Sequence, residues 1–93
     1  SLVQELNYRN RKGEYNYLLA LWLAQANNTE GAMAAAKEAE RDGHGQAPMI
    51  QAMLMLEEGK LPEARMAWDS LQTHANGSIA TMAKEIHEVL SSN

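Results

Sequence analysis

Residues 13–44 can be laid over residues 45–76 at a fixed offset of 32, and small or apolar residues then coincide at regular positions. The coinciding pairs are Gly13 with Gly45, Ala20 with Ala52, Leu23 with Met55, Ala32 with Ala64, Ala36 with Trp68 and Ala39 with Leu71. A period of this length is typical of stacked helical hairpins, because one hairpin cannot bury its apolar face alone. The sequence therefore predicts an all-α fold of antiparallel hairpins.

The composition limits how such a fold can be packed. A chain of 93 residues is one domain and buries only about 60% of the surface that its unfolded form exposes. Phe is absent and Met occurs six times, so we expect Ala, Leu and flexible thioether side chains to fill the core. Such a core adapts to its neighbours more readily than a core of aromatic rings.

Apolar spacing and helix-ending residues predict five helices, preceded by the end of another helix. Leu2, Val3 and Leu6 have helical spacing and read as the end of one helix, and the polar run 7–13 reads as a connector. The other predicted helices are 14–26, ended by Asn27–Asn28; 29–42, capped by Thr29 and stopped by Gly43; 48–58, opened by Pro48 and ended by Gly59; 62–74, opened by Pro62; and 78–91, capped by Ser78. Short connections make consecutive helices antiparallel neighbours.

These segments divide the chain into a short leading part and one domain. Residues 1–12 are predicted to hold the end of a preceding helix and its connector, and residues 13–93 the helical domain. Within that domain, 13–44 and 45–76 are the two repeats and 78–91 is a helix that covers the open end of the stack. Because the sequence starts at Ser1 without Met, we expect it to be a piece of a longer protein.

The spacing of small and large packing residues resembles that of the tetratricopeptide repeat family. The resemblance rests on Ala20, Leu23, Ala32, Ala36 and Ala39 in the first repeat and on Ala52, Met55, Gly59, Ala64, Trp68 and Leu71 in the second. Residues 59–68 also look similar to the last repeat of helical-repeat proteins in bacterial envelope assembly. This resemblance implies a short solenoid of two repeats plus a capping helix, serving as a scaffold that binds protein.

In that family the first helix of each hairpin lines a concave groove, which suggests where a partner would bind. Carried onto this sequence, the resemblance predicts a partner-binding face of six residues: Tyr17, Leu21, Gln25, Met49, Met53 and Leu56. Leu and Met side chains there would suit an amphipathic helix or an apolar peptide. Alternatively, these residues pack on an adjacent repeat or on a second copy of the chain, and the protein is a structural segment or a homodimer joined through Leu2, Val3, Leu6 and the apolar residues of the first full helix.

No residue cluster in the sequence indicates catalysis or metal binding. His44, His74 and His87 lack a second His or Cys at the spacing that helices use for metal ligands. His44 and His74 are expected at the ends of helices, where the helix dipole favours a partly positive imidazole ring. The acidic groups Glu38, Glu40 and Asp42 and the pair Glu57–Glu58 are typical of a solvated helix face. We therefore expect no enzyme activity, no catalytic residue, no cofactor and no metal ion.

The distribution of charge along the chain indicates which classes of partner are disfavoured. Residues 1–12 carry three basic residues and one acidic residue, which gives a net charge of +2. Because the whole chain has a net charge of −4, the remaining residues carry −6. That balance disfavours nucleic acid, because a duplex binder needs a basic stripe. The basic residues Arg9, Arg11 and Lys12 are expected to be solvated and not to bind a membrane, and Trp22 and Trp68 are both expected in the core. The absence of Cys leaves cytosol and periplasm equally open.

Overall fold

The computed structural model describes residues 1–92, and in that range it contains five α-helices and no β-strand. The helices are α1 (Leu2–Gln25), α2 (Thr29–Arg41), α3 (Ala47–Glu57), α4 (Leu61–Leu71) and α5 (Gly77–Ser91). The predicted all-α fold class is confirmed. Asn93, the last residue of the predicted domain, lies outside the described residues.

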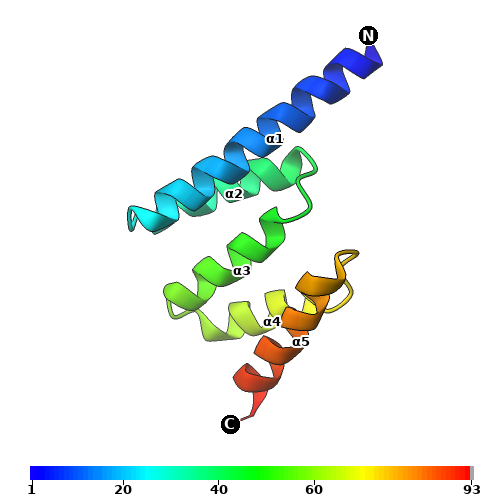
Figure 1. Ribbon diagram of the computed structural model, residues 1–93. Coiled ribbons are helices and arrows are strands. Elements are labelled where there is room, and N and C mark those ends of the chain that lie inside the picture. Colours follow the sequence, from blue (N-terminus) through cyan, green and yellow to red (C-terminus); the bar gives the residue numbers. More distant parts are fainter. Residues whose placement is uncertain (93) are drawn as a thin grey trace.

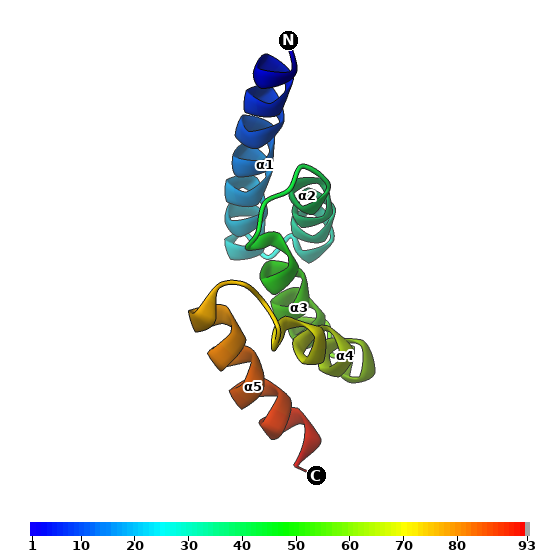
Figure 2. The ribbon, with the colours of Figure 1, turned by 90° about the vertical axis from the view of Figure 1, so that its right-hand side faces the viewer.

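The helices form a zigzag in which each helix packs against the next one along the chain, and α1 also packs against α3. Figure 1 shows that α1, α3 and α5 run in one direction and that α2 and α4 return in the other. In the view of Figure 2, α1 and α5 lie on one side, α2 and α4 lie on the other, and α3 lies between them. The result is an elongated body of 52 × 29 × 17 Å. Within residues 1–92, no helix is both long enough and apolar enough to cross a bilayer.

The helix ends follow the predicted breakers, with two corrections at the caps. Asn27, Gly43 and Gly59 adopt positive φ angles of 62°, 85° and 73°, which is the left-handed conformation that ends a helix. The predicted cap Thr29 lies one residue after the observed cap of α2, and the predicted cap Ser78 lies two residues after the observed cap of α5. Asn28 caps α2 by accepting a hydrogen bond from the Gly31 N–H, and Asn76 caps α5 by accepting from Ser78 and Ile79. Asn is as good a cap as Ser or Thr, so composition alone did not decide between adjacent candidates.

The prediction of a connector at 7–13 is wrong, because α1 continues without a break from Leu2 to Gln25. Its first half extends beyond the end of α2, which makes α1 the longest helix (Figure 1). Gly13 lies inside the helix, where Gly usually costs about 1 kcal/mol relative to Ala. It is buried, and a Cβ atom there would lie 3.3 Å from the Cβ of Asp42. Gly13 therefore permits the close passage of α1 over the end of α2, whereas Gly45, its partner in the alignment, lies in an open turn.

The core consists of two apolar clusters, and half of the residues of each are related by the offset of 32. Nine of the fourteen buried apolar residues are alanines. One cluster contains Ala20, Ala32, Ala35, Ala36, Ile50 and Leu54, and the other contains Ala52, Ala64, Trp68, Leu71, Ile79 and Ala83. Four of the six aligned pairs are therefore buried at both positions: Ala20 and Ala52, Ala32 and Ala64, Ala36 and Trp68, and Ala39 and Leu71.

The two tryptophans have opposite surroundings, so the expectation that both are buried is half wrong. Trp68 is fully buried in the second cluster, as predicted. Trp22 is 67% exposed, because it lies on the side of α1 that no other described helix covers. Helical spacing identifies an apolar face but does not say whether the molecule supplies a neighbour for it.

Replacing Trp68 with Ala is expected to lower the free energy of unfolding by about 3 to 5 kcal/mol, because it leaves a large cavity in the second cluster. Trp22→Ala is the matched control, and in dilute protein it should change stability by less than about 0.5 kcal/mol. Urea unfolding followed by circular dichroism measures both. Equal midpoints for the two variants would contradict the assignment of Trp68 to the core.

Replacing Ala36 with Leu is expected to destabilise the protein by about 1 to 3 kcal/mol, because the larger side chain overpacks the first cluster. Ala34 lies on the exposed side of the same helix, so Ala34→Leu should have little effect. Thermal unfolding of the two variants provides the comparison. A melting temperature for Ala36→Leu at or above that of Ala34→Leu would show that the helices can separate without cost.

Candidate partner-binding groove

The six predicted groove residues come from two neighbouring helices, and they differ in how much surface they leave free. Tyr17, Leu21 and Gln25 belong to α1; Met49, Met53 and Leu56 belong to α3, which packs directly against it. Gln25 and Met53 are exposed, with 47% of Met53 accessible, and the other four are half-buried. The predicted groove residues are therefore mostly apolar side chains that are partly engaged in packing.

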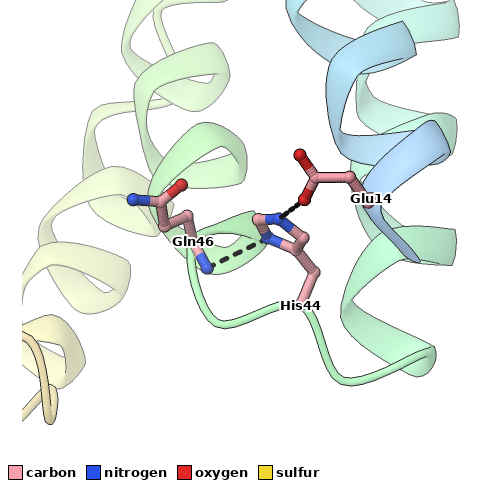
Figure 3. A network of polar contacts seen from close by, with 3 residues as sticks. All are labelled: Glu14, His44 and Gln46. Atoms are coloured by element: carbon pink, nitrogen blue, oxygen red, sulfur yellow. Dashed lines mark hydrogen bonds and ion pairs between the residues drawn. The ribbon is translucent and has the colours of Figure 1, made fainter. Parts of the chain in front are cut away.

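Tyr17 owes its position to His44, which lies in the connection between α2 and α3. The two rings stack with centroids 4.1 Å apart and planes inclined by 15°. The Nε2 atom of His44 lies 2.9 Å from Oε2 of Glu14, and the backbone N–H of Gln46 donates to its Nδ1 atom at 3.3 Å (Figure 3). Because Nδ1 accepts, Nε2 carries the proton and donates to the carboxylate. His44 thereby connects α1 to the start of α3 and holds Tyr17 at the surface.

His74 repeats this arrangement in the connection between α4 and α5. Its Nδ1 atom accepts from the backbone N–H of Asn76 at 2.9 Å, and its Nε2 atom donates to the carbonyl oxygen of Gly45 at 2.7 Å. Each histidine thus accepts from the residue two places later and donates back to the preceding hairpin. We predicted both histidines at helix ends but missed these links. The shared pattern of His followed two residues later by Gln or Asn, in 44–46 and 74–76, was the available signal.

Met49 and Leu56 are the residues of the predicted groove on α3 that also pack against the core. Met49 packs against both apolar clusters, so it bridges the first hairpin and the second. Leu56 packs against the second cluster, and Leu21 packs against the first. Met53 belongs to neither cluster, although it lies one helical turn from both Met49 and Leu56. Met53 is therefore the groove residue that a partner could contact with the least disturbance of the fold.

Two further contacts between charged or titratable side chains join different helices or their ends. Nε2 of His87 lies 3.6 Å from Oδ1 of Asp69, a contact between α5 and α4 that sequence spacing did not indicate. Arg9 Nε lies 4.0 Å from Oδ1 of Asp42, at the point where α1 passes the end of α2. Among the described residues, no three His, Cys, Asp or Glu side chains gather closely enough to hold a metal ion. The six groove residues provide a mostly apolar surface for contact, with two polar groups, the Gln25 amide and the Tyr17 hydroxyl, at its ends.

No family model matches the chain, and comparison with curated proteins and with solved structures gives no significant match. The architecture therefore rests on the helices and contacts described above.

Replacing His44 with Ala is expected to cost about 1 to 2 kcal/mol of stability, because the stacking on Tyr17 and the link to Glu14 are both lost. His87→Ala is the control, since its 3.6 Å contact with Asp69 is at the surface and should contribute little. Denaturant unfolding gives both values. If His44→Ala is no more destabilising than His87→Ala, the histidine does not join the two hairpins.

Proposed function

We propose that the protein is a tetratricopeptide-like interaction module that binds an amphipathic helix or apolar peptide along the face formed by α1 and α3. The helix order supports this proposal, because α1 and α3 run in the same direction and pack against each other, with α2 and α4 displaced to the other side (Figure 2). The first helices of the two hairpins thereby form a shared surface. Helical partners dock on surfaces of this kind through residues three and four places apart.

One observation carries the proposal. At three positions related by the offset of 32, α1 and α3 leave apolar side chains at least partly accessible: Tyr17 and Met49, Leu21 and Met53, and Ala24 and Leu56. The next positions at the same offset are Thr81, Glu85 and Glu88 of α5, all exposed. An apolar face thus spans two helices and gives way to polar and acidic residues on the third. A surface fully devoted to packing in this chain would not leave Met53 47% exposed.

The change from apolar to acidic residues along this face indicates which residues a matching partner would carry. A ligand that follows the face from α1 to α5 first meets Leu and Met side chains and then Glu57, Glu85 and Glu88, which are exposed. An amphipathic helix with leucine-like residues and a basic end matches this order. The thioether of Met53 adapts to side chains of different shape, which suits a module that accepts related sequences.

The alternative is that this face is covered permanently, in a structural repeat segment or an oligomer. The half-buried state of Tyr17, Leu21, Met49 and Leu56 favours it, because these residues already stabilise the fold. Exposed Met53 separates the two functions: a free groove requires it for binding, and the fold does not require it.

Met53→Glu is expected to weaken binding of an amphipathic Leu/Lys helical peptide at least about tenfold, because docking would desolvate the new carboxylate. Met66→Glu is the matched control: Met66 is 73% exposed on α4, away from the groove, and its replacement should leave binding unchanged. Fluorescence anisotropy with the labelled peptide measures both. Capture of partners from the native host with the same two variants would then identify the natural ligand.

Met49→Glu is a poorer test, because Met49 packs against both core clusters and its replacement would damage the fold itself. Circular dichroism should show unchanged helix content for Met53→Glu and Met66→Glu. If the peptide and every captured partner bind the two folded variants equally well, the groove is not the binding surface.

A further inference from the structure

The outer face of α1 carries a row of exposed apolar side chains that is separate from the groove. Tyr8, Tyr15, Leu18 and Trp22 are 70%, 65%, 54% and 67% exposed. Their spacing of seven, three and four residues places them on one side of the helix, and we refer to these four residues as the outer stripe. The buried residues Gly13 and Ala20 lie on the opposite side of α1. The outer stripe therefore faces away from the rest of the described molecule.

The residues 32 and 64 places after three members of the outer stripe are buried or packed against the core. At the offset of 32, Tyr15, Leu18 and Trp22 correspond to Ala47, Ile50 and Leu54 of α3, which are all buried. Ile50 and Leu54 belong to the first cluster, where they pack on Ala20, Ala32 and Ala36 of the preceding hairpin. At twice the offset stand Ile79, Met82 and Ile86 of α5, which pack in or against the second cluster. These positions thus dock onto a preceding element in α3 and α5, and within residues 1–92 only α1 leaves them uncovered.

The other end of the molecule is closed to the same kind of contact. The α5 positions that correspond to Ala20 and Ala52, and to Leu21 and Met53, are Lys84 and Glu85, both exposed. A second copy that placed its outer stripe against α5 would bury Lys84 and Glu85 against mostly apolar side chains, which is costly. Head-to-tail association of copies is thereby disfavoured. The remaining arrangement in which equivalent surfaces meet sets the outer stripe of one copy against the outer stripe of the other, as in the two-fold dimers that are most common.

Arg11 decides how the two helices would run. It lies within the outer stripe, between Tyr8 and Tyr15, and with Gln25 it completes a row at heptad spacing. A parallel pair would set Arg11 against Arg11 of the second copy, so that like charges face each other. In an antiparallel pair whose facing residue numbers add to 33, Arg11 lies over Trp22 of the second copy, Tyr15 faces Leu18, and Tyr8 faces Gln25. The guanidinium group then rests on an indole ring, which is a favourable cation–π contact.

We propose that two copies of this chain associate through their outer stripes as an antiparallel α1–α1 homodimer. Three aromatic side chains and one leucine from each copy remove on the order of 1,000 Å² from water, which is near the lower limit for a specific interface. The dimer is accordingly reversible and depends on concentration. Of the six groove residues only Gln25 lies in this contact, whereas Leu21 and Met53 lie outside it, so substitutions at Leu18 and Met53 test the dimer and the peptide site separately.

Sedimentation velocity over a wide range of protein concentrations tests this interface. The wild type is expected to shift from monomer to dimer, and Leu18→Glu is expected to weaken the dimer at least about tenfold. Leu61→Glu is the matched control, because Leu61 is 50% exposed at the start of α4 and its replacement should leave the dimer unchanged. Circular dichroism should show both variants fully folded, since each residue is already half exposed.

A wild type that stays monomeric at all concentrations would overturn the proposal and make a preceding helical hairpin of a longer chain the better occupant of the outer stripe. A dimer that survives Leu18→Glu, or that Leu61→Glu disrupts equally, would also overturn it. Met53→Glu should leave the dimer intact while weakening peptide binding, so failure of the groove and failure of the dimer are distinguishable.

The direction of the helices can be measured because the chain contains no cysteine, so one introduced thiol is labelled uniquely. A spin label on Glu5→Cys, outside the outer stripe, is expected to lie about 35 Å along the helix axis from its counterpart in the antiparallel dimer. A parallel dimer would bring the two labels side by side. A short distance in pulsed dipolar spectroscopy would therefore overturn the antiparallel arrangement.

Discussion

The close approach of helices at alanine residues is the constraint on which the rest of this structure depends. Ala20, Ala32, Ala36 and Ala52 have no accessible surface, and each allows a neighbouring backbone to come near. Alanine buries little apolar area, so the main hydrophobic stabilisation falls to a few large side chains such as Trp68, Leu54 and Ile50. The core is consequently split into two clusters, and Met49, which packs against both, carries much of the connection between the hairpins.

The hairpins are also joined through the connections between them. His44 and His74 each accept a hydrogen bond from the start of the following helix and donate one to an earlier part of the chain. These contacts link each connection to a residue about 30 places earlier in the chain, Glu14 for His44 and Gly45 for His74. His44 also stacks on Tyr17, so one residue of the proposed groove is held by a residue that lies outside it.

Helix α1 has three faces with different surroundings. One face packs on α2 through Gly13 and Ala20, and another turns toward α3 and carries Tyr17 and Leu21. The third is the outer stripe, which is covered by nothing in the described part of the chain. At the opposite end, the α5 residues that correspond to Ala20 and Leu21 are Lys84 and Glu85, both exposed. The molecule is therefore apolar at one end and polar at the other, and this asymmetry underlies both proposals.

The sequence by itself determined the all-α class, the helix-ending residues and the aligned positions of the core, since small residues and breakers act locally and recur at a fixed period. It also placed the six groove residues on two helices. Only the tertiary structure decided which apolar residues are covered: Trp68 is buried and Trp22 is exposed, although both have helical spacing. It also revealed that α1 runs through residues 7–13 and passes close to Asp42 at Gly13, an approach between residues far apart in the chain. Periodicity describes one helix at a time, whereas burial depends on whether another helix lies opposite.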